Sequence, residues 1–265
     1  MSKKRLYMIS IVVLLVIFLA IEVLNIFFAN DTNEYELIYG IATRGIGAAI
    51  CILMMAYCSF TYLFSSFGKL RDIVLIIPCC LIAINNFPFI SVIDGTATLD
   101  AKWYLVFLLA LQCFFVGVFE ETAFRGCVFM LILEKRHSTK KDIFCSIILS
   151  SLVFGGIHVV NLFAGAGVVS VVLQLGYSFL IGAMCSVVLL VTKKLWLPIL
   201  IHAVFNFAGA LIPTLGKGEI WGTATVVLTV IVSVAVATYT VALFFKYDLR
   251  KMQELFANKE KAIKL

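Results

Sequence analysis

Long, uninterrupted apolar runs constrain this chain more than any other feature of its sequence. Backbone groups in a bilayer core must be hydrogen-bonded within the protein, so spanning segments are helices or strands of a closed barrel. Continuous apolar runs, unlike short alternating ones, favour helices. We therefore predict an all-α, polytopic membrane bundle of about eight transmembrane helices. The runs lie near residues 6–29, 43–67, 73–93, 103–133, 143–163, 168–192, 195–213 and 220–246.

The composition agrees with a membrane protein. The 265 residues are 63% hydrophobic and 14% charged, whereas a soluble domain is roughly half apolar and a quarter charged. This chain has too little polar surface to cover a water-soluble globule. We expect one integral-membrane domain over residues 1–265, with its functional core at about 103–213. The basic tail at 247–265 is expected to form at most a short amphipathic helix.

Loop charges predict the orientation of the helices. Basic residues precede the first run and follow the second, fourth, sixth and last runs, while the intervening loops are acidic or nearly neutral. By the positive-inside rule, this alternation predicts that both termini are cytoplasmic. The net charge of +6 then reflects these loops and a tail that can touch anionic lipid, and it needs no nucleic-acid partner. Although MSKKR resembles the start of a signal peptide, we interpret residues 6–29 as an uncleaved first helix.

Ionisable side chains inside the apolar runs are few, and at bilayer depth such residues mark functional sites by default. Glu22 and Arg44 are predicted near the outer ends of the first two helices, where they can reach the interface or form a pair. The remaining ones are predicted to lie deeper. They are Glu120, Glu121, Arg125, His158 and His202.

The stretch FEETAFRG, residues 119–126, combines two carboxylates and a guanidinium. Glu121 and Arg125 are spaced i, i+4, so they share one helix face and can pair. Glu120 is rotated by about 100° and points elsewhere. We expect Arg125 to neutralise Glu121 and to leave Glu120 without a built-in countercharge, as suits a general base. The alternative is that both glutamates only lock helices together through salt bridges.

Two further runs carry groups with catalytic chemistry. His158 follows Gly155–Gly156, which would let a neighbouring helix approach closely, and Asn161 is a plausible partner for its ring. His202 and Asn206 share one helix face and could polarise a carbonyl or stabilise an oxyanion. A lone buried histidine more often serves as a hydrogen-bonding group between helices. Three helices that each supply such groups in an otherwise apolar chain favour a common site.

These motifs together resemble the CPBP family of intramembrane proteases, the CaaX-processing and bacteriocin-processing endopeptidases also called the Abi family. EExxxR at 120–125, FxxxH at 154–158 and HxxxN at 202–206 match in order. The resemblance implies peptide-bond hydrolysis in a membrane cavity that opens to the cytoplasm. It implies that Glu120 and His158 activate water, that His202 and Asn206 stabilise the oxyanion, and that Glu121 and Arg125 support them.

A metal is an open alternative. Zinc could be held by Glu120, His158 and His202 with a water in the fourth position. The HExxH motif is absent, and a glutamate-activated water with His and Asn donors is chemically sufficient. The eight cysteines show no CxxC or Cys/His metal spacing, so we interpret them as packing residues.

Three functions remain in competition at this point. The leading one is a bacterial plasma-membrane endopeptidase that cleaves a small membrane-associated peptide or lipidated protein. Its substrate would be a bacteriocin or quorum-sensing peptide precursor, or a CaaX-like protein. The second is a non-catalytic protein of the same fold that confers immunity to a toxin or modulates a sensor kinase. The third is a small transporter, although the chain shows no internal transporter-type repeat.

Overall fold

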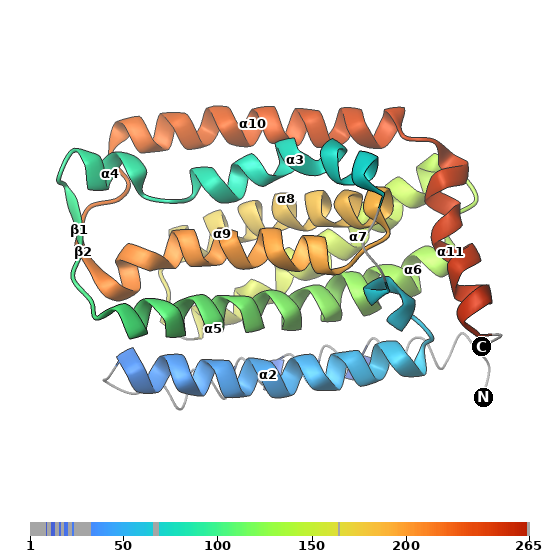
Figure 1. The fold of residues 1–265 in the computed structure, drawn as a ribbon, viewed down its shortest axis with the longest axis horizontal. Helices are drawn as coiled ribbons and strands as arrows, with labels where there is room; N and C mark the ends of the chain where they lie inside the picture. The colour runs from blue at the N-terminus through green and yellow to red at the C-terminus, as the bar shows by residue number, and fades with distance from the viewer. Residues whose placement is uncertain are drawn as a thin grey trace.

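The structure is a computed structural model that describes residues 33–65, 69–163 and 165–263, with isolated positions before residue 33. Long helices lie side by side along one axis, with one two-stranded sheet at an end (Figure 1). The predicted all-α class is confirmed. The elements are α2 (Asn33–Tyr57), 3-10 helix η1 (Thr61–Phe64), α3 (Leu70–Asn85), α4 (Phe89–Ile93), β1 (Ala97–Leu99), α5 (Trp103–Glu121), π-helix η2 (Thr122–Phe129), α6 (Met130–Lys135), α7 (Lys140–Ile157), 3-10 helix η3 (His158–Leu162), α8 (Val168–Thr192), α9 (Trp196–Leu215), β2 (Gly216–Gly218), α10 (Thr223–Lys246) and α11 (Leu249–Ile263).

Six helical segments of the described residues are long and apolar enough to cross a membrane, which agrees with a multi-pass membrane protein. They are α2, α5 continued through α6, α7 with η3, α8, α9 and α10. Most of the predicted first span at 6–29, Glu22 included, lies outside the described residues. The predicted span at 73–93 is divided between α3 and α4. Pro88 is the N-cap residue of α4, and a proline disfavours helical conformation in the residue before it.

The second predicted span is displaced toward the N-terminus. Hydropathy predicts residues 43–67, but α2 covers Asn33–Tyr57. A hydropathy window discounts the acidic first turn of this helix, although acidic side chains are favourable beside the positive end of the helix dipole. Arg44 consequently lies near the middle of α2, and its predicted place at the outer end of a helix is wrong.

The two ends of the bundle differ in the charge of their loops. At one end β1 pairs antiparallel with β2, with Ala97 opposite Gly218, and joins two loops that are not basic (Figure 1). At the other end the basic loops meet α11, where Lys193 forms an ion pair with Glu254. The alternation of loop charge along the sequence is therefore a separation of charge in space. The cytoplasmic placement of both termini stays a prediction.

The C-terminal tail forms the predicted short amphipathic helix, α11. Met252 and Leu255 on this helix are buried. Gln253 donates a hydrogen bond to the carbonyl oxygen of His137, in the loop before α7, at 2.9 Å. The helix is therefore docked on the end of the bundle through its own apolar face.

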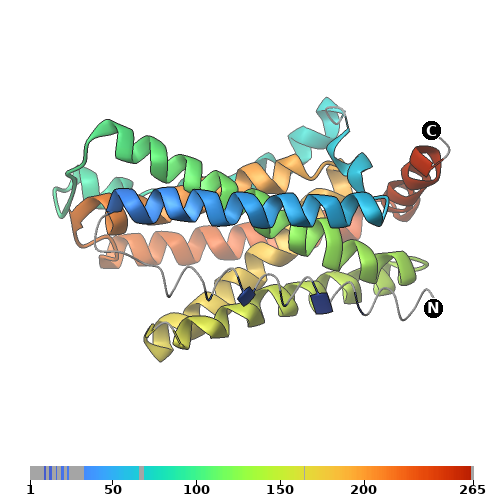
Figure 2. The ribbon, with the colours of Figure 1, turned by 90° about the horizontal axis from the view of Figure 1, so that it is seen from below.

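Close helix contacts bring together the elements that carry the predicted motifs. A Cβ at Gly117 of α5 would lie 2.9 Å from the carbonyl oxygen of Ile199, so α9 approaches α5 closely. Figure 2 shows α7 and the first part of α8 together along one edge of the bundle. A Cβ at Gly155 would lie 3.0 Å from the carbonyl oxygen of Leu175, which confirms the close approach predicted there. At Gly156 a Cβ would meet no atom within 4 Å.

Candidate active site

A π-helical segment follows the two adjacent glutamates directly. α5 ends at Glu121, η2 covers Thr122–Phe129, and α6 begins at Met130. All residues of η2 are buried. π-helical turns are rare and recur at functional sites, and their wider turn changes the direction of the side chains around them. The apolar run at 103–133 predicted one long helix and contains no signal for this change of pitch.

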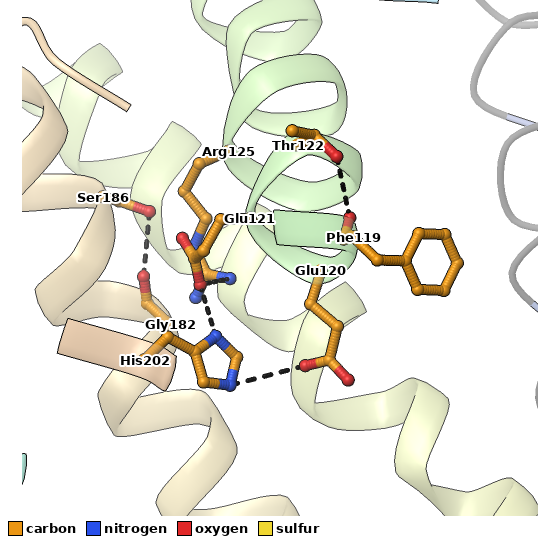
Figure 3. A network of polar contacts seen from close by, with 8 residues as sticks. All are labelled: Phe119, Glu120, Glu121, Thr122, Arg125, Gly182, Ser186 and His202. Atoms are coloured by element: carbon orange, nitrogen blue, oxygen red, sulfur yellow. Dashed lines mark hydrogen bonds and ion pairs between the residues drawn. The ribbon is translucent and has the colours of Figure 1, made fainter. Parts of the chain in front are cut away.

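Glu121 lies at the centre of a buried charge network (Figure 3). Its Oε1 accepts a hydrogen bond from Nη1 of Arg125 at 2.8 Å and lies 2.7 Å from Nδ1 of His202. The exposed fractions of these three residues are 0%, 2% and 4% respectively. The pairing of Glu121 with Arg125, predicted from their spacing, is confirmed. His202 joins the pair from a helix distant in sequence.

Glu120 lies on the other side of the same imidazole. Its Oε2 is 3.5 Å from Nε2 of His202, and the residue is 6% exposed. Glu120 therefore contacts a side chain of another helix, His202 on α9, whereas Arg125 pairs with Glu121. His202 thus connects the two glutamates through its two ring nitrogens.

Four of the six predicted site residues line one polar pocket. Glu120, His158, His202 and Asn206 border a cavity of about 140 Å³. They come from the end of α5, the start of η3 and the middle of α9, so the predicted convergence of three helices is present. The other two predicted residues belong to the buried network behind the pocket. The pocket is completed by Phe154, Gln174, Tyr177, Ser178, Ile181 and Phe205.

Phe154, the aromatic residue of the FxxxH motif, connects the buried network to the pocket. The guanidinium carbon of Arg125 lies 4.3 Å from the centroid of its ring. The rings of His158 and His202 lie 5.4 Å and 5.9 Å from the same ring, both edge-on. On α8, Gly182 leaves room for this arrangement, since a Cβ there would lie 3.0 Å from Nη2 of Arg125. One aromatic ring therefore contacts three of the predicted site residues.

Helix α8 supplies polar groups that the motifs did not predict. Gln174 and Tyr177 are three residues apart, on one face of the helix, and both line the pocket. Asn161, expected as a partner of His158, donates a hydrogen bond to Oε1 of Gln174 at 2.7 Å. This bond ties η3, which begins at His158, to α8. Their spacing within an apolar run was the available sequence signal for Gln174 and Tyr177.

Arg44 brings a positive charge from α2 to the neighbourhood of Glu120. It is half-buried, and its guanidinium carbon lies 5.9 Å from the centroid of the Phe119 ring. Arg44 lines a second, larger cavity of about 1460 Å³ that adjoins the polar pocket. The residues that border both cavities are Tyr177, Ile181, Phe205 and Asn206.

The donor set does not fit a metal centre as it is arranged here. Among the described residues, no three His, Cys, Asp or Glu side chains are grouped as the ligands of one ion. Both ring nitrogens of His202 face glutamates, and a zinc ligand would need one of them for the metal. Zinc binding by Glu120, His158 and His202 therefore stays a prediction, and the chemistry below is derived from the side chains alone.

Comparison with known proteins places the motif-bearing segment in a family. Residues 102–208 match the family described as type II CAAX prenyl endopeptidase Rce1-like. The matched segment contains the EExxxR, FxxxH and HxxxN motifs and the whole of the polar pocket. No curated protein and no solved structure matches the chain. The resemblance inferred from the three motifs is thereby confirmed: the segment that carries them is similar to the type II CAAX prenyl endopeptidase Rce1-like family over residues 102–208.

Proposed function

We propose that this protein is an intramembrane endopeptidase that hydrolyses a peptide bond near the end of a small membrane-associated peptide or lipidated protein. The observation that carries the proposal is the polar pocket, where Glu120, His158, His202 and Asn206 meet inside an apolar bundle. Ionisable groups at this depth are costly unless they serve a function. The CAAX protease family of the surrounding segment supports the same class of reaction.

Glu120 and His158 are suited to activate a water molecule. Both border the pocket, and a carboxylate within hydrogen-bonding reach of a water can act as its general base. Glu120 takes one proton as the water oxygen forms a bond to the carbonyl carbon of the substrate. The electron pair of the carbonyl double bond moves to its oxygen. When the carbon–nitrogen bond breaks, the proton held by Glu120 passes to the departing amine.

Asn206 is suited to stabilise the negative oxygen of the tetrahedral intermediate, and Nε2 of His202 can join it where the substrate displaces the 3.5 Å contact with Glu120. His202 and Asn206 are spaced i, i+4 on α9 and border the same pocket. Donors that are already oriented toward the developing charge supply a large part of the rate enhancement in acyl-transfer enzymes. Glu121 and Arg125 are positioning residues in this proposal, because Glu121 binds Nδ1 of His202 and Arg125 holds Glu121.

The larger cavity supports an apolar, membrane-associated substrate. It adjoins the pocket and is bordered mainly by apolar side chains of α8 and α10. A cavity of this kind can receive the acyl chain, prenyl group or apolar side chains of a substrate while the scissile bond reaches Glu120. Bacteriocin precursors, quorum-sensing peptide precursors and CaaX-like proteins share these properties, and we propose the bacterial plasma membrane as the place of the reaction.

Mass spectrometry of membrane-associated peptides tests the proposal. Cells that express the wild-type protein are compared with cells that express Glu120→Ala, at equal protein levels. The expected result is at least one peptide end that is present only with the wild type, and it identifies substrate and scissile bond together.

A matched control is Glu219→Ala, which removes an exposed carboxylate after β2. It should give the same peptide ends as the wild type. A biological activity that survives intact in Glu120→Ala, with no change in any peptide end, would contradict the protease and favour the non-catalytic immunity or signalling protein.

A further inference from the structure

The larger cavity has two unlike walls. Its wall on α8 and α10 is mainly aliphatic and aromatic, as a lipid-like group requires. Its wall on α2, α5 and α9 carries hydrogen-bonding and charged groups, which such a group does not need. The polar residues of this second wall are Glu36, Tyr39, Arg44, Gln112 and Asn206.

Arg44 is the one Lys or Arg among the described residues that border this cavity. It lies near the middle of a membrane-spanning helix, where an arginine is costly and by default serves a function. It also lies outside residues 102–208, so the family match assigns it no role. Its contact with the ring of Phe119 places it beside the residue that precedes Glu120 in the chain.

Gln112 lies against the face of α2 that also carries Arg44. A Cβ at Gly40 would clash with the side-chain amide of Gln112, so this amide lies directly against α2 at Gly40. Gly40 and Arg44 are spaced i, i+4 and therefore share one face of α2. The side-chain amide of Gln112 and the guanidinium of Arg44 thus belong to the same wall of the cavity.

We propose that Arg44 binds the C-terminal carboxylate of the substrate, with Gln112 beside it as a hydrogen-bonding group for the last peptide units. A guanidinium binds a carboxylate through two parallel hydrogen bonds, and this pairing is strong where water is excluded. Every unmodified peptide ends in a carboxylate. By binding this carboxylate, Arg44 fixes the number of residues between the end of the substrate chain and the scissile bond. The inference rests on the proposed protease function and makes the enzyme selective for substrates with a free C-terminus.

The test compares two synthetic substrates with the purified protein in detergent. Both are S-farnesylated peptides that end in Cys-aliphatic-aliphatic-Met; one has a free C-terminal acid and the other a C-terminal amide. For the wild type, kcat/KM for the acid should exceed that for the amide by roughly 10- to 100-fold, the value of one charge-assisted pair. In Arg44→Gln this ratio should fall to about one, mainly through a higher KM for the acid.

Two features of this design separate binding from folding. The acid and the amide are measured on the same preparation, so a partly unfolded variant lowers both rates and leaves the ratio unchanged. Arg44→Lys keeps the charge without the planar fork and should retain an intermediate ratio. If Arg44→Gln lowers both rates equally, Arg44 serves Glu120 and not the substrate, and the inference is overturned; a wild-type ratio near one overturns it as well.

A binding measurement separates this inference from the proposed function. Fluorescence anisotropy of the two labelled peptides on Glu120→Gln reports binding without turnover. If Glu120→Gln binds the acid more tightly than the amide and Glu120→Gln/Arg44→Gln does not, the carboxylate site is supported. This holds even if the wild type cleaves neither peptide, a result that would count against the protease function alone. Equal binding of acid and amide to both variants overturns the carboxylate site and leaves the protease standing.

Discussion

Glu120 and Glu121 are neighbours in the chain, but the fold gives them different surroundings. Glu121 is fully buried and touches Arg125 and His202, each within hydrogen-bonding distance. Glu120 borders a cavity, and its contact with His202 is longer, at 3.5 Å. A buried charge in close contact with its partners depends on them for compensation, whereas a carboxylate beside a cavity can exchange its partner for a water or a substrate. We therefore expect structural support from Glu121 and chemistry from Glu120.

The largest effect is expected from Glu120→Gln, which separates the two carboxylates by activity. Loss of a general base should lower kcat by about 10²–10⁴-fold. The amide keeps the shape of the side chain, so the unfolding midpoint in denaturant should change little. Turnover of a farnesylated peptide and the unfolding midpoint check this together. Retained turnover in a folded variant would remove Glu120 from the chemistry.

Arg125→Met tests the other carboxylate by stability. It leaves Glu121 buried without its cation, and loss of one partner of a buried ion pair costs about 3–5 kcal/mol. Denaturant unfolding of the purified variant measures this loss. The double variant Glu121→Gln/Arg125→Met removes both charges and should recover part of the stability. If Arg125→Met unfolds like the wild type, Glu121 is not held by a pair and the contrast with Glu120 disappears.

Asn206→Ala examines the pocket side of the comparison without touching a charge. Removal of one oxyanion donor should lower kcat by about 10²–10³-fold, because the donor acts mainly in the transition state. KM should change much less. Steady-state kinetics on the farnesylated peptide decide the matter. A change confined to KM would make Asn206 a substrate-binding residue. The set of residues proposed to take part in the chemical step would then be Glu120, His158 and His202.

The smallest effect is expected at Glu254, whose ion pair with Lys193 shows how much an exposed pair contributes to the free energy of unfolding. The hydrogen bond from Lys193 is the main reason that the pKa of Glu254 lies below its ordinary value of 4.5. A pKa that is lower in the folded state means that the pair stabilises the fold above pH 4.5 and loses this effect as the pH falls through the folded value. An exposed pair contributes only about 0.2–1 kcal/mol. Glu254→Gln should therefore remove a small, acid-sensitive part of the unfolding free energy; an effect as large as that of Arg125→Met would erase the distinction between buried and exposed pairs.

Much of this arrangement could be predicted from local sequence. Helices follow from apolar runs because a membrane forces the backbone to satisfy its own hydrogen bonds. The pairing of Glu121 with Arg125 was indicated by their i, i+4 spacing, and it is kept although Arg125 lies in the π-helix. The grouping of His158, His202 and Asn206 with Glu120 was indicated by motif spacing and by the scarcity of other polar groups.

The remaining features depend on packing between distant segments. The contact of His202 with both glutamates requires the close approach of α5 and α9. Gly117 permits this approach, but a single glycine in the sequence does not predict it. The central position of Arg44 depends on where α2 begins, and hydropathy locates helix ends poorly when the first turn is acidic. The π-helix after Glu121 depends on a small difference in backbone hydrogen bonding that side-chain patterns do not record.

The β1–β2 ladder has a consequence for the alignment of the catalytic groups. β1 lies just before α5 and β2 directly follows α9, and the amide of Asp100 donates to the carbonyl oxygen of Leu215 at 3.2 Å. The helices that carry Glu120 and His202 are thereby tied to each other at one end. A slip of one residue along either helix would move these side chains by about 1.5 Å, enough to break a contact of 2.7 Å between His202 and Glu121. A six-residue sheet at one end of α5 and α9 thus fixes how far Glu120 and His202 are displaced from each other along the helix axes.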